Sequence, residues 1–282
     1  MEHDESLPLV SNSQNSSPLN LRSLKFWQSA AAVFMLAQAI IVLILPLGTK
    51  VPVTIDFPDR DGENDSGPIG VPSFKILGAG LHVKYLIFSF LLLSGVDHFL
   101  WSVILWLQSP NNFFGHFLEK TLFKSNNPLR WIEYTFSASL MTILVAALSG
   151  IYNTHALLLV AEFTAVTMLL GWVIELIPKG KQRVISGSLF AIASATCLFA
   201  WIPIFCYFFQ AMSASSGDVP GFVIVAFLIT FLAYCAFAIN MFLYYFASLY
   251  SFHTAEVLYI LLSFTAKTVL AWDVWGGFKA AA

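Results

Sequence analysis

Seven long apolar stretches, separated mostly by short polar connections, constrain this chain more than any other feature of its sequence. They cover roughly residues 24–47, 83–107, 129–151, 155–177, 185–210, 221–250 and 254–275. A helix that crosses a bilayer needs about 20 apolar residues, so each stretch is long enough to span a membrane once. We therefore predict an all-α, multi-pass integral membrane protein with seven transmembrane helices in contact with membrane lipid.

The composition supports this assignment and excludes other classes of protein. Hydrophobic residues make up 58% of the chain and charged residues 11%, whereas a soluble domain carries about 25% charged residues. The net charge of -2 gives no argument for a nucleic-acid partner. Cys197, Cys206 and Cys235 all lie inside apolar stretches and show neither a disulfide framework nor zinc-ligand spacing. We expect no metal site and no catalytic residue, and hence no enzyme.

The polar segments set the expected boundaries of one domain. Residues 1–23 are polar and rich in Ser and Asn, which predicts a disordered tail rather than a cleavable signal peptide. Residues 24–276 form the seven-helix domain, and residues 277–282 form a short C-terminal tail. In the connection 48–80, apolar and polar residues alternate weakly around Val53, and the pair Asp61-Gly62 is a turn signal. It predicts a short β-hairpin over one mouth of the bundle, with an unstructured acidic loop as the alternative.

The distribution of basic residues predicts the orientation of the bundle. Seven Lys and Arg residues lie on the side of the N-terminus and five on the other side, three of them within the acidic connection 48–80. Cytoplasmic loops carry the excess of Lys and Arg, so we expect a cytoplasmic N-terminus and an extracellular C-terminus. The connection 48–80 is then extracellular, and the protein lies in the cell membrane.

Lys267, in the middle of the last apolar stretch, is the residue that most strongly indicates a functional site. An ammonium at bilayer depth is costly and is rarely kept without a partner or a use. The better candidate partner is Glu133, near the start of the third stretch. The pair is either a structural ion pair between two helices or a lysine that forms a Schiff base with an aldehyde, neutralised by the glutamate.

Helical spacing groups further residues with this pair. Arg130, Glu133, Tyr134, Ser137 and Met141 share one face of the third stretch. Leu144 continues that face, with no second carboxylate after it. Ser263 lies one turn before Lys267, where its hydroxyl bonds either a buried nitrogen or its own backbone.

Other polar residues inside the apolar stretches have less certain roles. Asp97 and His98 are adjacent, so their side chains point about 100° apart on the helix. Each of them lines a water cavity or has a structural role. Glu162 is expected to face the bundle or a second protomer, and Glu175 to reach the membrane interface. Aromatic residues such as Trp201 and Phe237 are more often part of the core packing than of a ligand pocket.

Three stretches carry a resemblance to a known family. Residues 130–141, 237–243 and 259–272 resemble the heliorhodopsins, within the microbial-rhodopsin fold, and the resemblance extends over all seven apolar stretches. It implies a dimeric rhodopsin bundle with its N-terminus inside and a hairpin in the first extracellular loop. Met35 stands where many members have a second cavity histidine, and Tyr244 where a glutamine is usual.

The resemblance also implies a chromophore site. Lys267 would carry all-trans retinal as a protonated Schiff base with Glu133 as its counterion, and Ser263 would lie where ion-pumping relatives have a second carboxylate. Phe237 would replace the usual tryptophan over the polyene. The remaining expected lining residues are Tyr134, Ser137, Met141 and Trp201. The expected polar cavity contains His98, Asp97, Glu162 and Arg130.

The function that follows is a photoreceptor, a light sensor that signals to an unidentified partner without pumping ions. One alternative is a light-gated passive proton channel using Asp97, His98 and Glu162. The other is a non-photochemical seven-helix receptor or transporter in which Lys267 and Glu133 form a structural pair. The absorption spectrum of the protein expressed with retinal separates this last alternative from the other two.

The orientation leads to a testable prediction. An epitope tag at Met1 should be protected on intact cells, and a tag at Ala282 should be labelled, because an odd number of spans places the termini on opposite sides. Labelling of both tags after permeabilisation is the control. The reverse pattern on intact cells would overturn the orientation.

Overall fold

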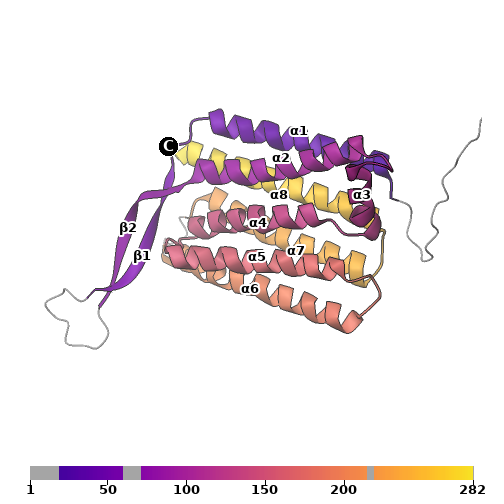
Figure 1. Ribbon diagram of the computed structural model, residues 1–282. Helices are drawn as coiled ribbons and strands as arrows, with labels where there is room; N and C mark the ends of the chain where they lie inside the picture. The colour runs from indigo at the N-terminus through magenta and orange to yellow at the C-terminus, as the bar shows by residue number, and fades with distance from the viewer. Residues whose placement is uncertain (1–18, 60–70, 215–218, 282) are drawn as a thin grey trace, which may run out of the picture.

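The computed structural model describes residues 19–59, 71–214 and 219–281. Residues 1–18 of the predicted tail, the Asp61-Gly62 turn signal and residue 282 lie outside this description. In the described part, seven helices are long and apolar enough to cross a membrane, which confirms the predicted number. The long helices lie side by side along one common direction (Figure 1).

The helix boundaries agree with the apolar stretches to within a few residues at most ends. The elements before the third span are α1 (Leu21–Ile44), β1 (Lys50–Asp59), β2 (Val71–His82), α2 (Val83–Leu107), α3 (Phe113–Lys120) and the 3₁₀ turn η1 (Leu122–Lys124). They are followed by α4 (Pro128–Leu148), α5 (Thr154–Leu176), α6 (Arg183–Ala214), α7 (Gly221–Met241), the π-helical segment η2 (Phe242–Phe246) and α8 (Phe252–Ala281).

Two predicted boundaries need correction. Helix α1 begins at Leu21, inside the predicted tail 1–23, because the side chain of Asn20 accepts a hydrogen bond from Ser23 N and caps the helix. At the other end, α8 runs through residues 277–281 of the predicted C-terminal tail. The helical part of the chain is therefore longer at both ends than the apolar pattern indicates.

Asparagine side chains cap the N-termini of several helices. The side chains of Asn112, Asn127 and Asn153 accept hydrogen bonds from the backbone of Gly115, Arg130 and Ala156, at the starts of α3, α4 and α5. A side-chain acceptor at this position satisfies one of the amide groups that the first helical turn leaves unpaired. In α4 the cap is followed by Pro128, whose fixed φ suits the first helical position. This places Arg130 and Glu133 in the first two turns of α4.

The connection 48–80 contains the predicted hairpin. Strands β1 and β2 pair antiparallel, with Thr54 opposite Ile76 and an irregularity between Val51 and Val53. Gly80 lies at φ +58°, where a side chain would also meet the carbonyl oxygen of Val51. Thr54 N donates to Tyr152 O (2.8 Å), which ties the hairpin to the turn between α4 and α5.

The bundle has two distinct ends. The base of the hairpin and the last residues of α8 lie at one end, called here the hairpin end, and α3 lies at the other, called the α3 end (Figure 1). Helices α2 and α8 start at opposite ends, and α4 starts at the α3 end together with α8. The beginning of α1 and the end of α8 therefore lie at opposite ends of the bundle, as an odd number of spans requires.

Gly171 allows a close approach between α4 and α5. A Cβ atom at this position would overlap the ring of Trp131, and Trp131 is itself buried. By contrast, a Cβ atom at Gly187 in α6 meets nothing within 4 Å.

We predict that Gly171→Ala lowers the stability of the bundle by about 1–3 kcal/mol, because overpacking displaces the rigid indole ring. Gly187→Ala is the matched control and should be neutral or stabilising by up to about 1 kcal/mol, since alanine favours a helix over glycine. Thermal unfolding of both variants in detergent measures the difference. Equal melting temperatures for the two variants would contradict the role of Gly171.

Candidate functional site

Lys267 lies in the interior of the bundle and has three polar partners. Its Nζ atom donates to Glu133 Oε1 (2.8 Å) on α4, to Ser263 Oγ (2.7 Å) on α8 and to Ser94 Oγ (3.2 Å) on α2. Lys267 is 3% exposed and Glu133 is 6% exposed. The ring of Tyr134 lies 5.1 Å from Nζ, close enough for a cation–π contact. Three helices thus converge on one buried amine.

The predicted face of α4 points at this amine. Arg130, Glu133, Tyr134, Ser137 and Met141 are all buried, as their shared helical face predicts. Ser263 bonds the lysine nitrogen instead of its own helix backbone, which decides between its two predicted roles. Ser94 was missed by sequence reasoning, because a serine in an apolar stretch gives no signal until its neighbouring helix is known.

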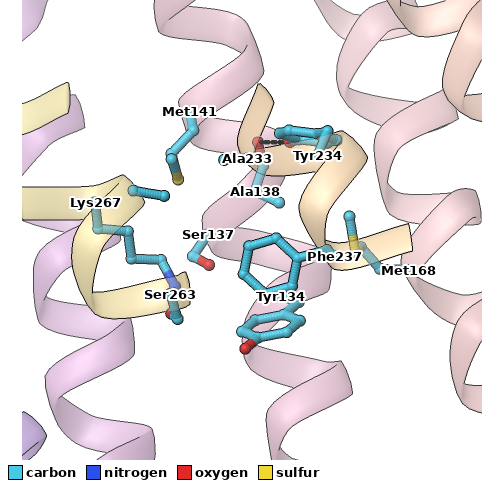
Figure 2. A pocket seen from close by; sticks show the side chains of 11 residues that line it. Tyr134, Ser137, Ala138, Met141, Met168, Ala233, Tyr234, Phe237, Ser263 and Lys267 are labelled. Carbon is cyan, nitrogen blue, oxygen red and sulfur yellow. Dashed lines mark hydrogen bonds between the residues drawn. The ribbon is translucent and has the colours of Figure 1, made fainter. Parts of the chain in front are cut away.

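An apolar cavity begins at the lysine. It encloses about 360 Å³ of empty space and is lined by residues of four helices. Figure 2 shows Lys267 and Ser263 facing Ser137 and Tyr134, with Phe237 and Met168 on the far side. Met141, Ala138, Ala233, Tyr234 and Ala266 complete the lining. The hydroxyl of Ser137 is buried there and bonds to none of the described residues.

A second cavity continues from the first between α5, α6 and α7. It encloses about 570 Å³ of empty space and shares Tyr134, Met168, Tyr234 and Phe237 with the first. Trp201, which was expected to line the ligand pocket, lines neither of these two cavities. Its ring packs edge-on against Tyr234 at 5.6 Å and so supports the wall from behind. The two cavities therefore adjoin each other, with Tyr134, Met168, Tyr234 and Phe237 between them.

A third, small cavity is polar and lies on the other side of Tyr134. Asp97 and His98 both line it, together with Gln28, Arg130 and Glu256 among others. Although Asp97 and His98 are adjacent on α2, both border this cavity, because it lies between α1, α2, α4 and α8. His98 Nδ1 lies 2.6 Å from Gln28 Oε1, which fixes the ring against α1. The cavity is large enough for a water molecule.

Arg130 joins this cavity to a buried cluster of two carboxylates. Its Nη2 atom donates to Glu175 Oε1 (2.5 Å), and its Nη1 atom is ion-paired with Glu256. Asn127 donates through its backbone to Glu175 (3.0 Å) and through its side chain to Glu256 (2.7 Å). Trp131 Nε1 also donates to Glu175 (2.7 Å). The guanidinium is thus held between two carboxylates from α5 and α8.

The sequence reasoning placed Glu175 near the membrane interface and missed Glu256. Glu175, the second-last residue of α5, points into the bundle and is 5% exposed, because Arg130, Asn127 and Trp131 satisfy its oxygens there. Glu256 lies eleven residues before Lys267, which is three helical turns back on the same face. That spacing was the signal that could have found it.

Glu162 does not belong to the polar cavity in which it was expected. It is exposed on the outer surface of α5 and borders a groove formed with α2 and α4. Val160 and Thr164, two residues before and after it, are buried. Residues two apart on a helix point about 200° apart, so Glu162 faces away from the bundle.

The polar residues of the interior are distributed unevenly along the bundle axis. Arg130 lies one turn before Glu133 and Glu256 three turns before Lys267, which places both nearer the α3 end by about 5 and 16 Å along their helices. We call Lys267, Glu133, Asp97, His98, Arg130, Glu175 and Glu256 the polar column. Towards the hairpin end the lysine is followed instead by buried Leu270, Leu144, Phe90 and Met35. The charged groups of the site therefore lie towards the α3 end, whereas towards the hairpin end the buried side chains named above are apolar and buried Gln38, which bonds Thr268 and Trp272, is uncharged.

Comparison with known proteins agrees with this geometry. A sequence model of the heliorhodopsin family matches residues 24–278. None of the curated proteins matches the chain in sequence.

Solved structures of microbial rhodopsins share the fold. The transmembrane domain of the Salpingoeca rosetta rhodopsin phosphodiesterase is 12% identical, with a TM-score of 0.62 over 92% of this chain and 84% of that one. The light-driven proton pump CsR of Coccomyxa subellipsoidea is 14% identical, with a TM-score of 0.60 over 92% and 97% of the two chains. Exiguobacterium sibiricum rhodopsin is 13% identical, with a TM-score of 0.54 over 95% and 99%. At these identities the likeness establishes the fold alone.

Proposed function

The chain belongs to the heliorhodopsin family, and on this premise we propose that it is a light-sensing retinal protein that does not pump ions. The observation that carries the proposal is a buried amine at the end of an apolar cavity, with a carboxylate 2.8 Å away. A structural ion pair alone would not need the adjoining cavity. The proposed cofactor is all-trans retinal, linked to Lys267 as a Schiff base.

The residues present suit such a cofactor. The cavity walls next to Lys267 are aromatic rings, methionine and alanine side chains, which accept an apolar polyene. Bound retinal would supply absorption of visible light and isomerisation of a double bond. The rings of Phe237 and Tyr134, which meet edge to face at 5.1 Å, would contact the polyene along its length. Glu133 would balance the positive charge of the linked nitrogen, and Ser263 and Ser94 would accept from it.

The distribution of acids supports a sensor rather than a pump. Pumping needs a proton donor on one side of the amine and an acceptor path on the other. In the described chain the buried acids near Lys267 belong to the polar column and lie towards the α3 end. Asp273, in the opposite half of α8, lies six residues past Lys267 and so points about 120° away from it. Ser263 carries no charge at neutral pH.

A second copy of the chain is the proposed partner at the outer face of α5. Glu162 borders a groove of about 720 Å³ there, among apolar and small side chains. A carboxylate facing lipid at this depth is costly, and a second protomer would cover it. The proposed orientation places the N-terminus in the cytoplasm, so that the α3 end of the bundle meets an unidentified signalling partner there.

The chromophore assignment predicts the spectra of two variants. Lys267→Ala, expressed with retinal, should fold and lack a visible absorption band. Glu133→Gln should replace the visible band by a near-ultraviolet band, which is typical of a deprotonated Schiff base. Removing one partner of a buried ion pair costs about 3–5 kcal/mol, which lowers the pKa of the Schiff-base nitrogen by roughly two to four units. Absorption spectra of the purified proteins provide the measurement. A colourless wild-type protein, or a coloured Lys267→Ala variant, would contradict the assignment.

The absence of pumping is a separate prediction. Illuminated cells that express the protein should show no change of external pH that a protonophore abolishes, because none of the described acids between Lys267 and the hairpin end faces the lysine as a proton donor. The light-driven pump named above, expressed in the same cells, is the positive control. A light-driven, protonophore-sensitive pH change would contradict the proposal. A current that appears down an imposed gradient would favour a light-gated proton channel.

A further inference from the structure

Helix α7 ends in the π-helical segment η2, which the proposed chromophore site does not explain. In η2 the backbone amide of Ala247 donates to the carbonyl oxygen of Phe242 (3.0 Å), five residues earlier. A π turn holds more residues than an α turn, is rare, and occurs mostly at functional sites, where it allows a helix to bend. The segment η2 therefore marks the place at which α7 can change its shape at the α3 end of the bundle.

One residue of η2 ties it to the connection between α5 and α6. Tyr245 is 6% exposed, and its hydroxyl donates to the carbonyl oxygen of Ile177 (2.8 Å), directly after α5. The same hydroxyl lies 3.1 Å from Oγ of Ser186, in the first turn of α6. We call these two contacts of the Tyr245 hydroxyl the latch.

Two further contacts join η2 to the same connection, and both use exposed cations. The Nζ atom of Lys179 lies 4.6 Å from the centre of the Tyr244 ring. The Nη2 atom of Arg183 lies 3.4 Å from the carbonyl oxygen of Phe246. Both cations are exposed to water, so the latch supplies the buried part of this contact.

The chain just before η2 is held by the opposite neighbour, α8. Asn240, two residues before η2, is 4% exposed, and its Nδ2 atom donates to the carbonyl oxygen of Ala255 (3.2 Å) in the first turn of α8. Its Oδ1 atom accepts from the hydroxyl of Tyr250 (2.5 Å). The end of α7 is thus fixed to α8 at Asn240 and to the α5–α6 connection at Tyr245. A π turn between two such contacts has the arrangement of a hinge.

The same helix forms one wall of the proposed chromophore site. Tyr234, Phe237 and Met241 of α7 all line the second cavity, and Met241 is the last residue before η2. The ring of Tyr259 stacks on Phe237, and its hydroxyl lies 3.5 Å from the sulfur of Met241. Met241 and Tyr245 are four residues apart, so about one helical turn separates the cavity wall from the latch. A displacement of this wall therefore reaches the latch over a short distance.

We propose that η2 is the element through which light changes the α3 end of the bundle, with the Tyr245 hydroxyl as its latch. The inference rests on the proposed function and names the regulation of the same site. In darkness the latch is closed. Under light the wall at Phe237 and Met241 moves, the π turn rearranges about Asn240, and the Tyr245 hydroxyl leaves Ile177. One element with two states, biased at the cavity and coupled to the α3 end, is the physical requirement for communication between two sites.

Hydrogen–deuterium exchange of the backbone amides, measured by mass spectrometry on the retinal-bound protein, tests the latch. The amides of residues 242–249 should exchange faster under illumination than in darkness, whereas those of residues 221–231, in the hairpin-end half of α7, should change less. Tyr245→Phe keeps the ring and removes the hydroxyl. It should raise the dark exchange of residues 242–249 by about two- to tenfold, which corresponds to the loss of one hydrogen bond, and should reduce their response to light.

Tyr207→Phe is the matched control, because it removes a hydroxyl from an exposed position of α6 far along the helix from the latch. It should exchange like the wild type in light and in darkness. A Tyr207→Phe variant whose exchange at residues 242–249 rises as much as that of Tyr245→Phe would overturn the latch.

The remaining outcomes separate this inference from the proposed function. A wild type without a visible band defeats both. A coloured wild type whose residues 242–249 exchange equally in light and darkness defeats the inference alone, as does a Tyr245→Phe variant with the dark exchange of the wild type. If Tyr245→Phe does not fold, the wild type decides: faster exchange of residues 242–249 under light supports the latch, and equal exchange overturns it.

Discussion

The buried ion pair between Lys267 and Glu133 is the interaction on which the rest of the interior depends. Taking an ammonium out of water is unfavourable by several kcal/mol, and a partner at 2.8 Å with two serine hydroxyls offsets that cost. The pair requires α2, α4 and α8 to meet at one level of the bundle. That level also marks where the polar column of charged side chains ends, so the pair sets both the position of the site and the limit of its charged half.

Arg130, Glu175 and Glu256 form a second group of buried, paired charges, which lies nearer the α3 end than Lys267 and Glu133. One guanidinium between two carboxylates leaves the cluster without enough positive charge to neutralise both acids, and Asn127 and Trp131 supply neutral donors instead. The cluster ties α4 to α5 and α8, which are otherwise joined here by apolar packing. Arg130 and Glu256 of this cluster also line the polar cavity.

Aromatic packing determines the apolar half of the site. Phe237 stacks on Tyr259 at 5.9 Å and meets Tyr134 edge to face, while Trp201 packs against Tyr234 from outside. Rings in such contacts move less readily than aliphatic chains, so the walls keep a defined shape around the space next to the lysine. A change in the shape of a bound chromophore would therefore be transmitted to α4, α7 and α8 together.

The sequence alone determined the seven spans, the hairpin as one of two options, and the common face of Arg130, Glu133, Tyr134, Ser137 and Met141. These features depend on the length of apolar segments and on periodicity within one helix, and both are local. The tertiary structure decided which helices are neighbours and how each is rotated. It turned Glu175 inwards and Glu162 outwards, brought Ser94 and Gln28 to the polar groups, and moved Trp201 behind the cavity wall. The physical reason is that a membrane helix is apolar on every side, so no contrast between water and core fixes its rotation in advance. Only the pairing of the few buried polar groups across helices does so, and that pairing exists in the folded bundle alone.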